Sequence, residues 1–247
     1  MNVNIIYSDS YLFAINKPAS MHSVNIKAKE ENSIVTLLEE RFKDLVNPDL
    51  KECGLLNRLD YQTSGVLLVA KTEQAYIKFK ALIKEHRIKK EYLAVVEGNA
   101  PAERCIKTFL GSPYRRSKRV RVYLSPTKRA LPAETHFFRV SYNKTHNISL
   151  LKAETVTGRR HQVRAHAAYI GHPLVGDRLY GSKILLSELM KNRNHLNKLP
   201  EFLLHAAKVE FLHPFSSKKI IVKAVVPDYW ESNIFFCDRN GHPLILR

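Results

Sequence analysis

Residues 57–70 read NRLDYQTSGVLLVA and join a polar, turn-rich loop to a continuous apolar run. The apolar part, residues 66–70, has the length and composition of a fully buried strand. A polar loop that leads into a buried strand is a common place for a catalytic side chain, and Asp60 is the carboxylate of this loop. The alternative is a structural loop in which Asp60 pairs with Arg58 and the neighbouring hydroxyl side chains bind backbone groups.

Outward from this stretch, the sequence predicts a mixture of strands and helices without regular alternation. Ser33 and Thr72 are N-cap residues for two helices, and a third helix is predicted over residues 158–170, with Gly171 as its stop signal. Further strands are predicted over residues 4–7, 11–15, 91–96, 120–124, 135–140, 148–153 and 220–226. The fold class is therefore α+β with a large mixed, largely antiparallel sheet. A doubly wound fold is disfavoured, and no GxGxxG or GxxxxGK[ST] loop indicates a nucleotide cofactor.

The charge of the chain indicates its class of partner. Its 247 residues are 45% apolar and 26% charged, which is ordinary for a globular protein and excludes wholesale disorder. Forty Lys and Arg against 23 Asp and Glu give a net charge of +17, which attracts polyanions such as nucleic acid or an anionic membrane. No apolar run approaches the roughly 20 residues that span a bilayer. The beginning of the chain lacks the pattern of a signal peptide. Nucleic acid is therefore the expected partner, and no membrane is expected.

The cysteines argue for a reducing compartment. The chain has three cysteines, which is an odd number, and they lie far apart in the sequence without a CxxC pair: Cys53, Cys105 and Cys237. A disulfide framework and a cysteine-based zinc site are both disfavoured. We expect three reduced thiols in a cytoplasmic protein.

A second segment, residues 157–166, reads TGRRHQVRAH. On a helix Arg160 and Arg164 would lie one turn apart, with His161 beside Arg164, which favours binding of a carboxylate or phosphates. The alternative is a solvated basic helix face. A metal site is not expected, because the five-residue spacing between His161 and His166 does not place both on one helical face.

A third segment, residues 112–129, is strongly basic and also contains two tyrosines. Basic residues interleaved with aromatic ones suit a nucleic-acid backbone with stacked bases. The alternative is a solvated basic loop. Its basic residues are Arg115, Arg116, Lys118, Arg119, Arg121, Lys128 and Arg129, and its tyrosines are Tyr114 and Tyr123.

Taken together, these segments resemble the RluA-type pseudouridine synthases over nearly the whole chain. Residues 58–65, RLDYQTSG, match the family's RLDxxTSG, and residues 90–98, KEYLAVVEG, match its K-x-Y-x-A-x-V-x-G stretch. Residues 158–164, GRRHQVR, are similar to its GRxHQxR. The pattern continues in residues 11–19, 171–173, 176–177, 180–181, 204–206, 213–214 and 226–227.

The resemblance implies the fold of these enzymes, with a central active-site cleft, and their reaction. Uridine within rRNA or tRNA is isomerised by cutting the C1′–N1 bond, turning the uracil and rejoining it through C5. Asp60 matches the catalytic aspartate, Arg164 the arginine that pairs with it, and Tyr92 the aromatic residue that stacks on the uracil. Arg58 matches a residue that fills the gap left by the extruded nucleotide. No metal or organic cofactor is implied. The RNA-binding residues that we expect are Arg58, Arg115, Arg116, Lys118, Arg119, Arg121, Arg160 and His161.

Two features concern the family pattern. Asn57 stands where the family often has His, and we expect a local change of hydrogen bonding, because Asn still offers a donor and an acceptor. The catalytic pattern begins within the first dozen residues, so we expect residues 1–247 to form a single catalytic domain without a separate N-terminal RNA-binding domain. The basic segment 112–129 would then supply the affinity for RNA. We also expect a monomer.

Two other functions are compatible with parts of the sequence. One is a non-catalytic RNA-binding protein on the same scaffold, which fits the charge equally well but gains little from a carboxylate near phosphates. The other is an acid–base hydrolase that uses Asp60 or Asp177 with His161, which leaves the charge unexplained. Asp177 is otherwise interpreted as a structural loop residue.

Overall fold

The computed structural model describes residues 3–25, 33–189 and 199–230. The chain divides into two compact units, residues 1–90 with 206–225 and residues 91–205 with 226–247. The divisions fall within strand β4 (Lys89–Glu97) and strand β9 (Leu204–Leu212). No helix in the described residues is long and apolar enough to cross a membrane. Cys237 lies outside the described residues.

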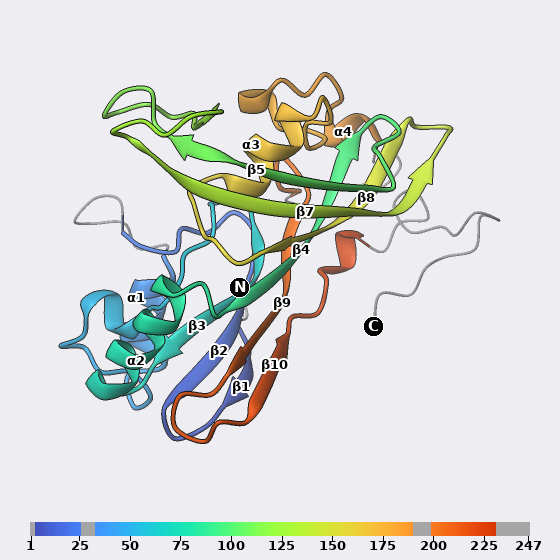
Figure 1. The fold of residues 1–247 in the computed structure, drawn as a ribbon. Helices are drawn as coiled ribbons and strands as arrows, with labels where there is room; N and C mark the ends of the chain where they lie inside the picture. Colours follow the sequence, from blue (N-terminus) through green and yellow to red (C-terminus); the bar gives the residue numbers. More distant parts are fainter. Residues whose placement is uncertain (1–2, 26–32, 190–198, 231–247) are drawn as a thin grey trace. The chain divides into compact units, whose positions relative to one another are not determined.

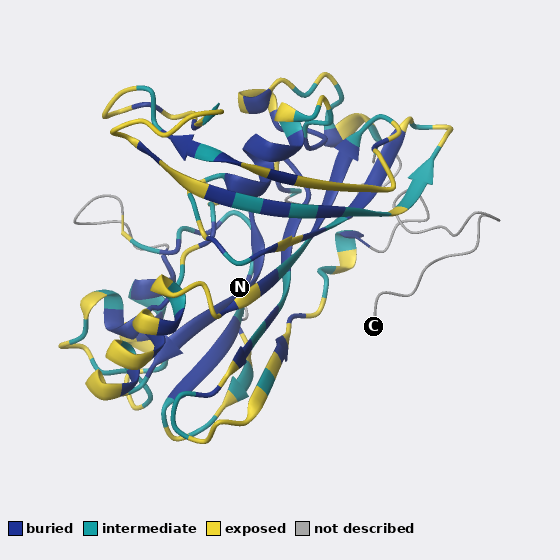
Figure 2. Ribbon diagram, in the orientation of Figure 1, coloured by how far each residue is buried: buried dark blue, intermediate teal, exposed yellow. Residues whose placement is uncertain are grey.

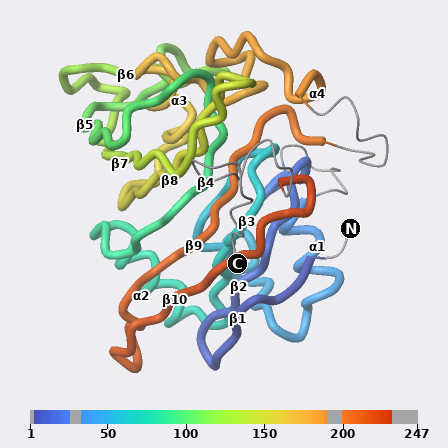
Figure 3. The backbone as a smooth tube through the Cα atoms, turned by 90° about the vertical axis from the view of Figure 1, so that its right-hand side faces the viewer, coloured from blue at the N-terminus to red at the C-terminus, as the bar shows by residue number. Residues whose placement is uncertain are grey.

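The first unit is built on short strands, of which β1 with β2, β2 with β3 and β9 with β10 pair antiparallel (Figures 1 and 3). Its strands follow the order β1-β2-β3-β9, and β10 pairs with β9. β3 is buried at every residue, as Figure 2 shows, so the apolar run after the Asp60 loop is a central strand. The bounds are β1 (Ile5–Ser8), β2 (Leu12–Lys17), β3 (Ser64–Ala70) and β10 (Lys219–Lys223).

Two helices complete this unit, and both begin where the sequence predicts. Helix α1 (Ile34–Arg41) begins after Ser33, whose hydroxyl accepts from the Thr36 amide at 3.1 Å. Helix α2 (Glu73–Lys84) begins after Thr72, which caps the Ala75 amide at 3.2 Å. α2 buries Phe79 and Leu82 against a core from β2, β3, β9 and β10. A short 3-10 turn, η1 (Lys51–Gly54), precedes the Asp60 loop.

The second unit is a larger, mostly antiparallel sheet with the order β4-β8-β7-β5-β6. Helix α3 (Gln162–Tyr169) covers it and buries Val163 and Ala167 in a core with β4, β5, β7 and β8. The strands are β5 (Glu103–Gly111), β6 (Arg121–Tyr123), β7 (Ala130–Asn143) and β8 (Ile148–Thr155). The short helices are η2 (Arg178–Tyr180), α4 (Leu186–Leu189) and η3 (Asp228–Trp230).

These elements confirm the predicted α+β class with a mostly antiparallel sheet, and they correct it in two places. Strands β5 and β9 were not predicted as strands. Helix α3 begins at Gln162 rather than at residue 158, because residues 158–161 form a turn in which His161 has a left-handed backbone with φ of 54°. The single catalytic domain and its central cleft stay predictions.

Candidate active site

The loop that carries Asp60 is held by the segment that follows β2 in the first unit. The Ser23 hydroxyl donates to the Leu59 carbonyl at 2.8 Å and accepts from the Leu59 amide at 3.0 Å. The Met21 amide donates to the Tyr61 carbonyl at 3.3 Å. Asp60 therefore lies between Leu59 and Tyr61, whose backbone groups are both hydrogen-bonded. Asp60 itself is partly buried.

Lys17, at the end of β2, stabilises the same loop through hydrogen bonds to backbone carbonyls. Its fully buried ammonium group donates to the carbonyls of Pro18 and Met21, both at 2.8 Å, and of Tyr61 at 3.3 Å. Burial lowers the pKa of Lys17 to about 7, while the nearby charge of Asp60 acts in the opposite direction and raises it. The Asp60 carboxylate thus has a buried amine as an electrostatic neighbour. In the sequence, Lys17 stands out only as part of the family pattern.

The turn after Asp60 leads directly into β3. The Thr63 amide donates to the Asp60 carbonyl at 3.0 Å. Gly65 has a φ of +116°, and a Cβ atom there would lie 2.2 Å from the Ala206 carbonyl oxygen on β9. Only glycine fits this close approach of two strands, which explains the glycine of the TSG stretch.

Asn57 uses both ends of its amide to bind the β3 backbone. Its Oδ1 accepts from the Leu68 amide at 2.8 Å, and its Nδ2 donates to the Val66 carbonyl at 3.3 Å. Asn57 therefore pairs with β3 as a neighbouring strand would, and it secures the beginning of the Asp60 loop.

Arg58 points to the surface of the first unit. Its side chain is 59% exposed, and its guanidinium forms an ion pair with Glu52 Oε1 at 3.1 Å. Arg58 therefore has the Glu52 carboxylate as a partner within its own unit.

Arg164 of the second unit forms a buried, two-pronged ion pair with Asp177. Arg164 Nε donates to Asp177 Oδ2 at 2.6 Å, and the terminal nitrogen NH2 donates to Oδ1 at 2.9 Å. The two side chains are only 7% and 2% exposed. The guanidinium carbon also lies 4.4 Å from the Phe202 ring centroid and 5.1 Å from that of Tyr180. Asp177 is thus a structural residue, as the sequence suggested, and its partner is Arg164.

Tyr180 connects this pair to the basic segment. Its hydroxyl accepts from the Val120 amide at 3.0 Å and lies 3.1 Å from His161 Nδ1. The Arg119 guanidinium carbon lies 5.3 Å from the centre of its ring. Sequence reasoning gave Tyr180 no role, because the contacts that define one come from residues 19 and 60 positions away.

Arg160 does not lie on helix α3, so the expected one-turn spacing from Arg164 is wrong. Its guanidinium nitrogen NH2 instead donates to the Ser117 carbonyl at 2.7 Å and to the Ser112 hydroxyl at 3.3 Å. The turn before the helix is held by the buried Gln162 side chain, whose Oε1 accepts from the Thr157 hydroxyl at 2.8 Å and from the Arg159 amide at 3.1 Å. Arg160 thereby fastens the basic segment.

The basic segment itself presents its cations to solvent. Ser117 is its buried anchor, and the Ser117 hydroxyl donates to the Arg119 carbonyl at 2.6 Å. No Asp or Glu occurs in residues 112–129. Its exposed cationic residues are Arg115, Arg116, Lys118, Arg119, Arg121, Lys128 and Arg129.

Tyr92 lies in β4 and is partly buried against the apolar core of the second unit. This placement leaves part of its ring outside the core. The strand fixes the direction of the side chain, as a stacking residue requires.

His166 of the second segment and His172 beyond it both have protein partners. His166 is fully buried between two threonine hydroxyls, Thr108 at 2.9 Å from Nε2 and Thr135 at 2.8 Å from Nδ1. His172 Nδ1 lies 2.8 Å from the Glu97 carbonyl. Within the described ranges, no group of three or more His, Cys, Asp or Glu residues is arranged to hold a metal ion. Cys53 and Cys105 are free thiols.

His166 makes stability depend on pH below 6.5. Burial lowers the pKa of His166 from 6.5 to about 4, so the unfolded chain takes up this proton first as the pH falls. The stabilisation is fully present above pH 6.5, and about 3 kcal/mol of it is lost between pH 6.5 and 4. Urea unfolding at several pH values measures this. In His166→Leu, which is less stable throughout, this part of the pH dependence should vanish; an unchanged slope would contradict the assignment.

Comparison with known proteins identifies the family of the chain. The profile of the family described as RNA pseudouridylate synthase matches residues 11–169. The chain is 32% identical over 236 residues to ribosomal large subunit pseudouridine synthase C of Buchnera aphidicola subsp. Schizaphis graminum, covering 93% of this chain and 69% of that protein. It is 29% identical over 245 residues to tRNA pseudouridine synthase C of Vibrio parahaemolyticus, covering 94% and 93%.

Solved structures show the same fold. Human RNA Pseudouridylate Synthase Domain Containing 1 superposes with a TM-score of 0.69 at 23% identity, covering 92% of this chain and 84% of the human chain. Human RNA Pseudouridylate Synthase Domain Containing 4 gives a TM-score of 0.70 at 20% identity, covering 92% and 90%. The fold, the family profile and the sequence identity agree, and the chain belongs to the RNA pseudouridylate synthase family of isomerases.

Proposed function

We propose that this enzyme isomerises specific uridines of rRNA or tRNA and that Asp60 is its catalytic carboxylate. The observation that carries the proposal is the fixation of the Asp60 loop by Ser23 and Lys17 on one side and by β3 on the other. The backbone on both sides of Asp60 thus keeps its position during the reaction, which limits the reorganisation that the carboxylate undergoes. The family match and the names of the relatives support the class of substrate.

The proposed reaction exchanges one glycosidic bond for another within the same nucleotide. The C1′–N1 bond breaks, the uracil turns, and a C1′–C5 bond forms; C5 loses its hydrogen as a proton and N1 gains a proton, so that atoms and charge balance. Asp60 acts on the sugar, either as a nucleophile at C1′ or as a base that removes a sugar proton. Neither course requires a metal ion or an organic cofactor, and neither changes the oxidation state of the nucleotide.

We assign supporting roles to two residues of the second unit. Tyr92 stacks on the target uracil, for which its partly exposed ring on a rigid strand is suited. Arg164 matches the arginine that the family pairs with its catalytic aspartate, and the Asp177 carboxylate together with the Phe202 ring holds its guanidinium in one orientation. Residues 1–247 thus act as one catalytic domain, which we expect to be a monomer in the cytoplasm.

RNA binding is assigned first to the basic segment. Its exposed cations lie on a loop that Arg160 and Tyr180 fasten to the rest of the second unit. Arg58 is assigned to the space that the extruded uridine leaves, and extrusion costs a few kcal/mol that an inserted side chain offsets in part. The full set is Arg58, Arg115, Arg116, Lys118, Arg119, Arg121, Arg160 and His161.

The alternative of a non-catalytic RNA-binding protein is not favoured, because the family and its named relatives are enzymes. Release of tritium from RNA labelled at uridine C5 tests the proposal. Purified protein should release tritium from total rRNA or total tRNA. Absence of release from both, under conditions where the protein binds them, would count against the proposed substrates.

The basic segment should contribute a defined share of the salt dependence of RNA binding. Changing Arg115, Arg116, Lys118 and Arg119 together to Gln should lower the slope of log affinity against log salt concentration by about 3, since each phosphate contact contributes roughly 0.7–0.9. Fluorescence anisotropy measures this slope. The control changes four exposed cations outside the segment, Lys43, Arg104, Lys144 and Lys183. An equal loss of slope in both variants would mean that net charge, and not the segment, determines binding.

A further inference from the structure

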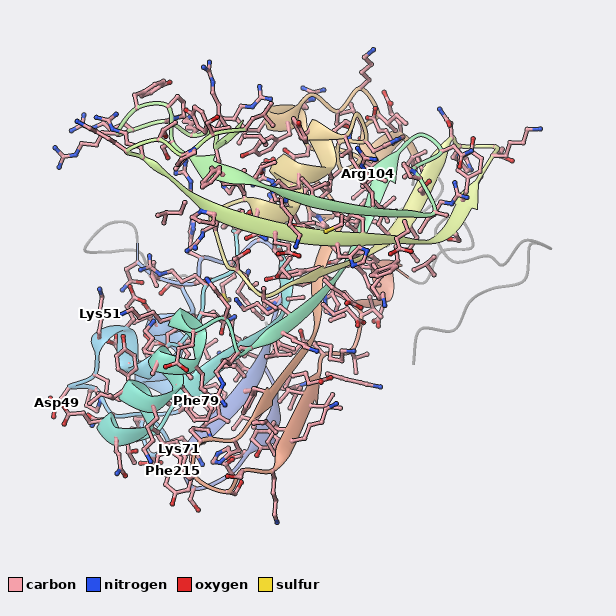
Figure 4. The ribbon with its side chains drawn as sticks, in the orientation of Figure 1. Asp49, Lys51, Lys71, Phe79, Arg104 and Phe215 are labelled. Atoms are coloured by element: carbon pink, nitrogen blue, oxygen red, sulfur yellow. The ribbon has the colours of Figure 1, made fainter. Side chains whose placement is uncertain are left out.

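Five residues of the first unit form a charged group beside the Asp60 loop, which we call the Glu52 cluster: Lys51, Glu52, Arg58, Tyr76 and Lys80. Arg58 pairs with Glu52 Oε1 at 3.1 Å. The Lys80 ammonium donates to the Leu56 carbonyl at 3.1 Å and lies 5.3 Å from the centre of the Tyr76 ring. Lys51, labelled in Figure 4, is on the 3-10 turn that precedes the loop. Leu56 immediately precedes Asn57, so the cluster is attached to the beginning of the catalytic loop.

The cations of the cluster outnumber its single carboxylate. Burial is the largest cause of the lowered pKa of Lys80; Glu52 raises that pKa, and Arg58 and Lys51 lower it by repulsion. Three cations that are exposed to solvent and one carboxylate leave two positive charges in the cluster. The cations repel one another, and their excess positive charge attracts an added anion.

The backbone at Glu52 is held in an uncommon conformation. Glu52 and Cys53 have left-handed φ angles of 54° and 52°. Gly54 follows with a φ of +83°, and a Cβ atom there would lie 2.2 Å from the Ala70 carbonyl oxygen. Non-glycine residues adopt this region at a cost, and such positions concentrate at functional sites. This turn positions Glu52 so that its carboxylate pairs with Arg58.

We propose that Lys51 and Lys80 bind a backbone phosphate of the RNA next to the target uridine, and that this phosphate displaces the Glu52 carboxylate from Arg58. The inference rests on the proposed function, because it takes RNA as the substrate. A phosphodiester carries one negative charge, as the Glu52 carboxylate does, and it is bound by the same lysine and arginine groups. Release from Glu52 also frees Arg58 for the space that the uridine leaves. In the competing explanation, Glu52 and its cations only stabilise the turn.

Neutral replacements of the two lysines test the phosphate site. Lys51→Gln and Lys80→Gln should each raise the Kd and KM for RNA about three- to tenfold and lower the salt slope by about 0.7–0.9, with kcat unchanged. Lys51→Gln breaks none of the hydrogen bonds named above, so it keeps the test valid should loss of the Lys80–Leu56 bond disturb folding. The matched control is Lys78→Gln, on the same helix, whose ammonium lies 4.2 Å from the centre of the Phe215 ring. Effects no larger than those of Lys78→Gln would overturn the proposal.

Glu52→Gln separates the two explanations by the sign of its effect. If Glu52 competes with phosphate, the variant should bind RNA about threefold more tightly or better at low salt. If Glu52 only stabilises the turn, binding will be unchanged or weaker, and either result overturns the proposal. Tritium release by the native protein is measured in parallel. Normal release with unaltered RNA affinity in these variants refutes this inference alone, whereas absence of release from the native protein refutes the proposed function.

Discussion

Replacing Asp177 by Ala is expected to lower the free energy of unfolding by about 3–5 kcal/mol. The substitution removes a nearly fully buried carboxylate that accepts two hydrogen bonds from Arg164, at 2.6 and 2.9 Å. The guanidinium keeps its charge at any pH at which the protein folds, so the loss cannot be offset by deprotonation. The midpoint and slope of urea unfolding, followed by circular dichroism, measure the effect.

A double variant tests whether the loss comes from the remaining charge. Asp177→Ala combined with Arg164→Met removes both charges and should recover part of the stability, because breaking a buried pair costs more than replacing both members by apolar side chains. A single-variant loss below about 1 kcal/mol would contradict the importance of the pair. A double variant less stable than the single one would contradict its electrostatic origin.

Replacing Asp60 by Asn is expected to lower kcat by about 10³-fold or more, since Asn can act neither as a nucleophile nor as a base. Asn has nearly the same size as Asp, and the backbone bonds of the loop to Ser23 and Lys17 do not involve the Asp60 side chain. The Kd for RNA should therefore stay within about twofold of the native value, because the binding cations are unchanged. Single-turnover kinetics and anisotropy measure the two quantities.

Asp49→Asn serves as the control for Asp60→Asn. Asp49 is an exposed carboxylate of the same unit, and its loss should change neither kcat nor Kd. If Asp60→Asn lost RNA binding together with turnover, Asp60 would be a binding or folding residue. If turnover fell by less than about tenfold, another group would supply the chemistry.

Local signals predicted much of the first unit. Ser33 and Thr72 cap the helices for which they were chosen, and Asp9 accepts from the Tyr11 and Leu12 amides in the turn between β1 and β2. These interactions join residues two or three positions apart, so the sequence alone contains them. The buried strand after the Asp60 loop, residues 66–70, was likewise predicted from its composition, because a central strand is apolar on both faces.

Elements that depend on distant partners were missed. β5 alternates buried residues such as Ile106 with exposed ones such as Lys107, but its charged beginning, Glu103 and Arg104, obscures the pattern. The start of α3 was placed too early because the Gln162 amide, which binds the backbone of residues 134 and 159, fixes a turn where helix propensity alone favours continuation.

In the candidate site, too, local features were predicted and contacts between distant residues were not. The motif around Asp60 and the exposure of the basic segment follow from the sequence. The bond between Arg160 and the Ser117 carbonyl spans 43 positions, and that between Tyr180 and the Val120 amide spans 60. The pairing of Glu52 with Arg58 occurs at a left-handed backbone position, which a glutamate in the sequence does not predict. These contacts arise from the folded chain and not from local pattern.

The most direct test of the central claim is tritium release from RNA labelled at uridine C5, measured side by side for the native protein and Asp60→Ala at matched RNA occupancy. Formation of the C1′–C5 bond must expel the hydrogen on C5. The account predicts release by the native protein and none by Asp60→Ala. Equal release by both proteins would contradict Asp60 as the catalytic carboxylate.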